Sequence, residues 1–206
     1  MRSRARPEYW NHNAAYYPLL RRLTAGKKRI LDAGCGEGAL VRFLAEPGRE
    51  ITGVDPDEGC IRRASARAAA GTEFQCCTLE GFSDPGPFDA VIFSASLHHM
   101  DGEKALDRAA ALLDRGGLLL IVGLGSPSTP GDRLLEILRV IPCAALSRLH
   151  RQRSAEDLGV PVSYELPPMG EVRALIRHKL PGARLRQGLY YRWLLRWEKP
   201  LKQKSI

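Results

Sequence analysis

The sequence predicts an α/β fold with a doubly wound, mostly parallel sheet of seven strands, an antiparallel C-terminal strand and helices on both faces. Two observations predict this fold. Apolar segments of strand length alternate with segments of helical periodicity along residues 29–122, and glycines follow the first apolar segment directly. Strands that are apolar throughout must be covered on both faces, which is typical of a parallel sheet packed between helices.

The elements follow one another in a regular order. Residues 8–23 predict one or two short helices that are rich in aromatic side chains. Strands are predicted at 29–32, 50–55, 74–77, 88–93 and 117–122. Helices are predicted between them at 40–44, 58–70 and 103–113, where apolar residues recur at helical spacing. A helix at 172–180 and a strand pair at 183–189 and 191–197 close the fold.

The composition changes beyond Gly125, where serines, prolines and a threonine predict a loop at 126–130. Asp132 is the predicted N-cap of the helix that follows. The apolar side of this helix consists of Leu134, Leu135, Ile137, Leu138 and Ile141. Pro142 should end or kink the helix. We expect the apolar side to cover a substrate pocket rather than to lie on a membrane.

Charge and cysteine content limit the partners. The formal net charge of +8 would suit a nucleic acid, but the basic residues are dispersed among carboxylates, so nucleic-acid binding is not favoured. Five cysteines without C-x-x-C spacing indicate reduced thiols and no metal site. No apolar run approaches the ~20 residues that cross a bilayer, and the N-terminus lacks the apolar stretch of a secretory signal. We expect a cytoplasmic protein without membrane contact.

A strand, a glycine turn and a helix follow one another at 29–44. Gly34 and Gly36 allow a ligand to approach the backbone closely, and the spacing also fits a nicotinamide dinucleotide. Asp32 distinguishes a dinucleotide from a ligand with a cationic amino acid tail. Its carboxylate would repel the pyrophosphate of the first and attract the positive charge of the second. Asp55 ends the second strand, where an acidic side chain can accept hydrogen bonds from ribose hydroxyls.

Several segments carry motifs of one known family. They are 30–38 with a complete D-x-G-x-G-x-G core, 54–57, the F-D-x-V at 88–91, the L-H-H-M at 97–100, and the helix and turn at 104–120. Together they resemble class I S-adenosylmethionine-dependent methyltransferases, closely over residues 8–124 and more loosely in the closing strand pair. The resemblance implies a Rossmann-like fold, S-adenosyl-L-methionine as cofactor and S-adenosyl-L-homocysteine as product.

The resemblance also implies the cofactor contacts. The expected residues are Asp32, Gly34, Cys35, Gly36, Asp55, Pro56, Thr78, Leu79, Ser94 and Tyr17. Asp32 would line the methionine end of the cofactor and Asp55 would hold the ribose. The adenine contacts depart from the family, because Cys77 or Thr78 stands where an acidic residue is common, and Glu80 would have to replace it.

Methyl transfer from a sulfonium is an in-line displacement, so alignment and exclusion of water supply most of the catalysis. For a hydroxyl or ammonium acceptor, His98 or His99 is the candidate base. Either histidine could instead simply pack or hydrogen-bond at a helix start. His12 and Tyr16, together with the two histidines, are the candidates for contact with the substrate.

We expect a single domain over residues 1–206. Its parts would be an N-terminal helical lid (1–24), a cofactor-binding core (25–124), a cap over the substrate (125–170), and a closing helix and strand pair (171–206). The expected acceptor is a small molecule, and the expected assembly is a monomer or a homodimer. Methylation of RNA or protein, and a non-catalytic protein that binds the cofactor, are the alternatives.

Overall fold

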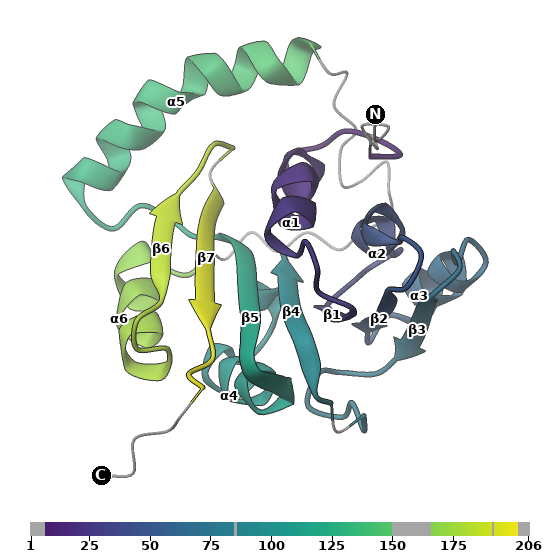
Figure 1. The fold of residues 1–206 in the computed structure, drawn as a ribbon. Helices are drawn as coiled ribbons and strands as arrows, with labels where there is room; N and C mark the ends of the chain where they lie inside the picture. The colour runs from purple at the N-terminus through teal and green to yellow at the C-terminus, as the bar shows by residue number, and fades with distance from the viewer. Residues whose placement is uncertain (1–6, 85, 150–165, 191, 202–206) are drawn as a thin grey trace, which may run out of the picture.

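One sheet of seven strands organises the protein, in the order β3-β2-β1-β4-β5-β7-β6 (Figure 1). The computed structural model describes residues 7–84, 86–149, 166–190 and 192–201. The strands are β1 (Arg29–Ala33), β2 (Glu50–Asp55), β3 (Thr72–Cys76), β4 (Phe88–Ser94), β5 (Leu113–Leu124), β6 (Arg184–Gln187) and β7 (Arg192–Glu198). Strands β1 to β5 pair in parallel, and β7 is antiparallel to both of its neighbours. The predicted fold class is therefore confirmed.

Helices cover both faces of this sheet. They are α1 (Tyr17–Leu23), α2 (Ala39–Leu44), α3 (Glu58–Ser65), α4 (Gly102–Leu112), α5 (Pro130–Leu149) and α6 (Met169–Lys179), with 3-10 turns η1 (Ala14–Tyr16) and η2 (Leu97–His99). Alternate strand residues point to opposite faces. Ile30 belongs to a buried cluster with α1 and α2, whereas Leu31 belongs to one with α4 and α6.

Some element boundaries differ from the sequence prediction. The helix predicted at 58–70 ends at Ser65. Beyond it, the Thr72 hydroxyl donates to the Ala69 carbonyl and accepts from the Ala69 N–H, which forms a turn in place of more helix. Residues 150–165 of the expected cap and Tyr191, the expected start of the last strand, lie outside the described residues.

Helix α5 begins with a reciprocal pair of hydrogen bonds. The Thr129 hydroxyl accepts from the N–H of Asp132 at 3.1 Å, and the Asp132 carboxylate accepts from the N–H of Thr129 at 3.1 Å. This is the geometry of a capping box, with Asp132 three residues after the cap. The prediction that Asp132 is itself the N-cap was wrong. Of the two effects expected of Pro142, an end of the helix was wrong, because α5 continues to Leu149, and a kink there stays a prediction.

The apolar side of α5 faces solvent. Leu134, Ile137 and Leu138 are 58%, 66% and 64% exposed, and Leu135 is 40% exposed. The opposite side carries Asp132, which is buried. The expectation that the apolar side covers a pocket was therefore wrong for these four leucine and isoleucine side chains. The reason is that α5 is held to the rest of the protein through polar contacts of Asp132 with α6 and β6.

Over the described part of the chain, every helix is too short or too polar to cross a membrane. Within the same residues, no group of three or more histidine, cysteine or acidic side chains is arranged to hold a metal ion.

Candidate functional site

The loop between β1 and α2 is fixed by the end of β2. The backbone N–H groups of Gly34 and Cys35 both donate to the Val54 carbonyl, at 2.8 and 3.0 Å. The N–H of Gly36 donates to Oδ2 of Asp55 at 2.9 Å. The loop lies where the strand order reverses between β1 and β4, the place at which open α/β sheets bind their ligands.

The two glycines of this loop serve different needs. Gly34 has a φ of +76°, and a Cβ there would lie 2.4 Å from the Cβ of Ser96, so no larger residue fits. Gly36 has a φ of +52°, but a Cβ there would meet no atom within 4 Å. The backbone at Gly36 is therefore open to a ligand, as close approach to a nucleotide requires.

Asp32, near the end of β1, is 1% exposed. Its Oδ1 atom has no hydrogen-bond partner among the described residues. Burial and then the charge of Asp55 raise the pKa of Asp32 to about 7. The Tyr17 pKa is also raised, by burial first, with a contribution from Asp32 that places the two side chains near one another. A buried carboxylate with an unused oxygen is a site for a cationic or hydrogen-bonding ligand group.

The other predicted cofactor contacts surround the ends of β2 and β3. Oδ1 of Asp55 accepts from the N–H of Asp57 at 2.9 Å, and the N–H of Cys77 donates to the Asp55 carbonyl at 3.1 Å. Thr78 is exposed, and its hydroxyl accepts from Gly81 N–H at 3.1 Å. Leu79 is buried in the core. The structure brings this group to one edge of the sheet.

Cys35 and Pro56 flank the same edge. The Cys35 side chain is half-buried, and burial is the main cause that raises the pKa of its thiol. The thiol is therefore neutral and unreactive. Pro56 is exposed, and its carbonyl accepts from the Cys76 thiol at 3.6 Å.

The end of β4 is strained. Ala95 has a φ of +61°, which is unfavourable for a residue with a side chain. Its N–H donates to the Val122 carbonyl at 2.7 Å, and the next residue, Ser96, donates its hydroxyl to the Ala33 carbonyl at 2.5 Å. The Ser94 hydroxyl is buried and has no partner among the described residues. Backbone strain that neighbouring bonds hold in place is common at functional sites.

The two candidate catalytic histidines differ in their surroundings. Their ring centroids lie 4.0 Å apart. His99 is exposed, whereas His98 is half-buried and its Nδ1 has no partner among the described residues. Burial, then His99 and Arg192, lower the pKa of His98 to about 4. His98 is therefore neutral at physiological pH and retains a free ring nitrogen.

The candidate substrate residues of the N-terminal segment contact the turn between β6 and β7. The Tyr16 hydroxyl donates to the Leu189 carbonyl at 2.8 Å. The His12 ring stacks on Tyr190 with centroids 4.7 Å apart. Asn13 accepts two hydrogen bonds from Arg192. The aromatic N-terminal segment therefore lies over β7.

A cavity of about 540 Å³ opens beside His98, between η2, α4, α6 and the adjacent parts of β5 and β7. Most of its lining is apolar, and includes Leu97, Met100, Leu124, Val172 and Trp193. Met100 connects it to the glycine loop, because its Cε lies 3.3 Å from where a Cβ on Gly34 would be. A cavity of this size and lining suits a small ligand.

Buried polar atoms without a partner gather at this edge of the sheet. Among the described residues there are five such side-chain atoms: Asp32 Oδ1, Ser94 Oγ, His98 Nδ1, Trp193 Nε1 and Arg108 Nε. All but the Arg108 atom belong to the site. Unsatisfied buried polar groups are rare in native proteins, and a bound ligand is one explanation for them.

Trp193 and Arg192 were missed from the sequence. They begin β7 and reach the site because Trp193 pairs with Gly123, 70 residues earlier in the chain, and Arg192 pairs with Leu124, 68 residues earlier. The sequence showed basic and aromatic side chains in the last strand, but this pattern did not indicate that Arg192 and Trp193 reach the site.

The comparisons agree with the fold. A family model described as a methyltransferase domain matches residues 30–117. An uncharacterized methyltransferase of Mycobacterium tuberculosis is 33% identical, over 93% of this chain and 98% of that protein. A ubiquinone biosynthesis O-methyltransferase of Idiomarina loihiensis is 36% identical, over 41% of this chain and 37% of that protein.

A solved structure shares the fold. Magnesium protoporphyrin IX methyltransferase from Synechocystis, with bound S-adenosylhomocysteine, has a TM-score of 0.59 and 21% identity, and the match covers 91% of this chain and 83% of that one. The sheet order, the glycine loop and the relatives define a class I S-adenosylmethionine-dependent methyltransferase. This chain belongs to the methyltransferase family.

Proposed function

We propose that this protein transfers a methyl group from S-adenosylmethionine to a small-molecule acceptor, which binds beside His98 at the carboxyl ends of β4 and β5. The observation that carries the proposal is the gathering of unpartnered buried polar atoms on Asp32, Ser94, His98 and Trp193. Asp32 belongs to the cofactor half of the site, Ser94 lies between the two halves, and His98 and Trp193 belong to the acceptor half.

The residues present fit the cofactor. The free Oδ1 of Asp32 would accept a hydrogen bond from the ammonium group, and the open face of Gly36 would admit the ligand to the backbone. Asp55 would accept from the ribose hydroxyls. When bound, S-adenosylmethionine supplies a methyl group on a positively charged sulfur. The remaining predicted contacts, at Cys35, Pro56, Thr78, Leu79, Ser94 and Tyr17, belong to this same proposal.

The chain's own contribution to the reaction is alignment and exclusion of water. The strained backbone at Ala95 places Ser94 and Ser96 between the two halves of the site. His98 is neutral and has a free Nδ1, so it can accept a proton from an acceptor that loses one, or hold the acceptor by a hydrogen bond. His99, which is exposed, is the weaker candidate for either role.

The small-molecule class is supported by the shape of the acceptor side. The cavity beside His98 has a volume of about 540 Å³ and is lined mostly by apolar side chains, with Asp101, Glu103 and Glu171 among the rest, which suits a small ligand better than an RNA or a protein. The five cysteines are all free thiols, which supports a reducing compartment, and we place the reaction in the cytoplasm. The proposed domain is a single unit, in which the N-terminal segment covers the site as a lid.

Two measurements test the proposal. Calorimetry should detect S-adenosylmethionine and S-adenosylhomocysteine binding to the wild type, with a loss of about 1 to 3 kcal/mol in Asp32→Ala. Asp114→Ala, at an exposed acid remote from the loop, is the matched control. Cell extract incubated with methyl-labelled cofactor should then yield a labelled small molecule in mass spectrometry. Label confined to RNA or protein, or cofactor binding without any product, would reject the small-molecule assignment.

A further inference from the structure

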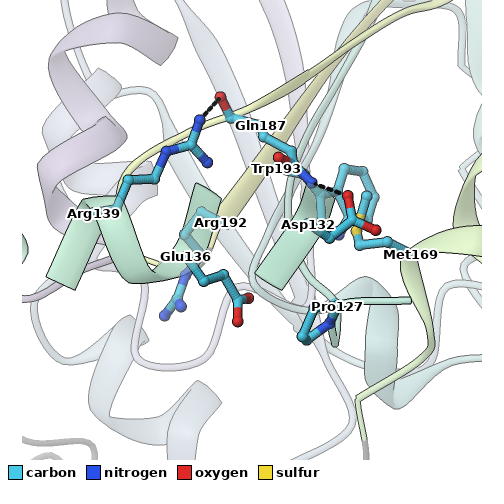
Figure 2. A pocket seen from close by; sticks show the side chains of 9 residues that line it. Pro127, Asp132, Glu136, Arg139, Met169, Gln187, Arg192 and Trp193 are labelled. Carbon is cyan, nitrogen blue, oxygen red and sulfur yellow. Dashed lines mark hydrogen bonds between the residues drawn. The ribbon is translucent and has the colours of Figure 1, made fainter. Parts of the chain in front are cut away.

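Arg192 is the first residue of β7 and lies beside the acceptor half of the site. It pairs with Leu124 at the carboxyl end of β5. It lines a small cavity together with Gly125 and Trp193, and Trp193 also lines the larger cavity beside His98. In Figure 2 its guanidinium points away from Asp132 and Gln187. The group is therefore directed apart from the ion pair that anchors α5.

The partners of this guanidinium are neutral. Nε and Nη2 donate to Oδ1 of Asn13 at 3.0 and 2.8 Å, and Nη1 donates to the Tyr190 carbonyl at 2.9 Å. No carboxylate of the described residues lies within ion-pair distance of it. Burial lowers the pKa of Arg192 to about 10. A half-buried positive charge without an anionic partner is unfavourable unless a ligand supplies one.

Two acids, Asp132 and Glu136, line the same small cavity, and neither is paired with Arg192. Asp132 accepts from both Nη atoms of Arg173, at 3.1 and 2.5 Å, and from Gln187 at 2.8 Å. Glu136 lines the cavity but forms no ion pair with Arg192 in the described structure. Arg139 also lines this cavity, but it lies near Glu136, the pKa of which is raised by burial first and partly lowered by the charge of Arg139, so among the described residues Arg192 is the cation of the cavity whose charge is left uncompensated.

His98 lies close enough to Arg192 for the guanidinium to help lower the His98 pKa. Arg192 therefore lies near His98, and of the two only Arg192 is charged at neutral pH. An anion between them would compensate the charge of Arg192 and could accept or share a hydrogen bond with His98.

We infer that the methyl acceptor carries a carboxylate and that Arg192 binds it. The inference rests on the proposed function, because it names the class of acceptor for that site. An arginine has five N–H donors, of which three are used by Asn13 and Tyr190. The two that remain match the two oxygens of a carboxylate. The apolar cavity beside His98 would hold the rest of the acceptor.

A carboxylate suits this site better than a phosphate monoester. One guanidinium balances one negative charge, whereas a phosphate monoester carries nearly two at neutral pH. The carboxylates of Asp132 and Glu136 line the same small cavity and would repel a second negative charge. The expected acceptor is therefore an apolar monocarboxylic acid.

The test is a binding series in the presence of saturating S-adenosylhomocysteine. The probes are straight-chain carboxylic acids from hexanoate to dodecanoate, the alcohols of the same lengths, and the corresponding alkyl phosphates. Calorimetry should show that the wild type prefers the acid, and that Arg192→Gln weakens acid binding by about 30-fold or more while alcohol binding changes little. Arg192→Lys should retain part of the preference.

Two control variants separate charge from folding. Asn13→Ala removes the same tether to the N-terminal segment but keeps the guanidinium, so it should retain the preference for acids. Arg196→Gln removes an exposed positive charge from the same strand and should change nothing. The inference is wrong if no acid binds the wild type more tightly than its alcohol, if alkyl phosphates bind best, or if Asn13→Ala loses the preference as fully as Arg192→Gln. S-adenosylhomocysteine binding is measured first, so a failure of the proposed function is seen separately.

Discussion

The backbone N–H of Gly36 donates a hydrogen bond to Oδ2 of Asp55 over 2.9 Å. The other oxygen of Asp55 accepts from the N–H of Asp57, also at 2.9 Å. Each carboxylate oxygen can accept about two hydrogen bonds, so each still has capacity for a ligand hydroxyl. The glycine loop and Asp55, the proposed ribose ligand, thus hold each other in place before any cofactor arrives, and this preorganisation should contribute to affinity.

Replacing Asp55 with Ala should weaken S-adenosylmethionine binding by about 1 to 3 kcal/mol, because it removes the ribose acceptor and releases the Gly36 N–H. Calorimetry measures the affinity. Asp57→Ala is the control: it removes the side chain that caps α3 at the Cys60 N–H and should lower the free energy of unfolding slightly, but it keeps the backbone bond to Asp55. Equal affinity losses in the two variants would contradict the role given to Asp55.

Asp32 should give the cofactor affinity a dependence on pH. Its pKa of about 7 means that the carboxylate is mostly protonated at about pH 6 and mostly ionised at about pH 8. Because the ionised form attracts the cationic amino acid tail, affinity should rise roughly tenfold over that interval. Calorimetry at several pH values measures this change. Asp32→Asn, which cannot ionise, should bind more weakly and show a flat profile.

Because of Asp32, the free energy of unfolding of the cofactor-free protein should fall as the pH rises, whereas the cofactor affinity should rise. The pKa of this carboxyl is raised above the usual aspartate value of 3.8, so the folded state holds its proton more tightly than the unfolded chain does. The resulting stabilisation is full below about pH 4 and is lost as the pH rises through about 7. Urea unfolding at pH values across this window should show a smaller decrease in Asp32→Asn than in the wild type.

Gly36 and Gly38 should separate binding from folding. Both have a positive φ, of +52° and +76°, so a substitution by Ala costs about 1 kcal/mol in backbone strain at either position. A Cβ at Gly38 would also lie 2.5 Å from the Phe74 ring, and such overpacking costs a further 1 to 3 kcal/mol or so. Gly36→Ala should chiefly reduce cofactor affinity, and Gly38→Ala should chiefly reduce the free energy of unfolding. Calorimetry measures the cofactor affinity of both variants, and urea unfolding measures their free energies of unfolding.

The cofactor half of the site could be predicted from the sequence because it is local. Asp32, Gly34 and Gly36 lie within one strand and one turn, and Asp55 ends the next strand, which pairs with the first residue for residue. A strand that leads into a glycine turn leaves few other geometries for the chain. The parallel sheet was predictable for a similar reason, since its strands are apolar throughout.

The acceptor half depends on contacts between distant segments. Arg192 meets Asn13 across 179 residues, and Tyr16 meets Leu189 across 173. Helix α5 illustrates a second limit. Amphipathic periodicity identifies the apolar and polar sides of a helix, but it does not show which side packs against the rest of the protein. In α5 the polar side does so, because Asp132 accepts a hydrogen bond from Arg173, 41 residues away.

His98 should be tested by its effect on the pH profile of turnover. Its pKa of about 4 keeps it neutral above about pH 5, so the wild-type rate should show no inflection near 6.5, the usual pKa of a histidine. If His98 accepts a proton from the acceptor, His98→Gln should reduce turnover by about 100-fold and leave cofactor affinity unchanged. His99→Gln, at the exposed neighbour, is the control. Turnover that is unchanged in both variants would leave alignment as the whole catalytic contribution.

Asp132 should be the main anchor of α5. Its carboxylate accepts from two N–H groups at the start of the helix and from Arg173 and Gln187, and Arg173 holds the pKa of this acid well below its usual range. Asp132→Ala should therefore lower the free energy of unfolding by about 2 kcal/mol, a value reduced because Arg173 is 31% exposed.

The contribution of Asp132 to the free energy of unfolding should also depend on pH. Because its pKa in the folded protein lies below the usual aspartate value of 3.8, the stabilisation is present above about pH 4 and is lost as the pH falls further. Glu136→Ala, one turn along the same helix, removes an acid without these partners and should cost little. Urea unfolding at about pH 7 and about pH 3 measures both effects. A variant at Asp132 that loses no more stability than Glu136→Ala at neutral pH would show that α5 is held in place by other contacts.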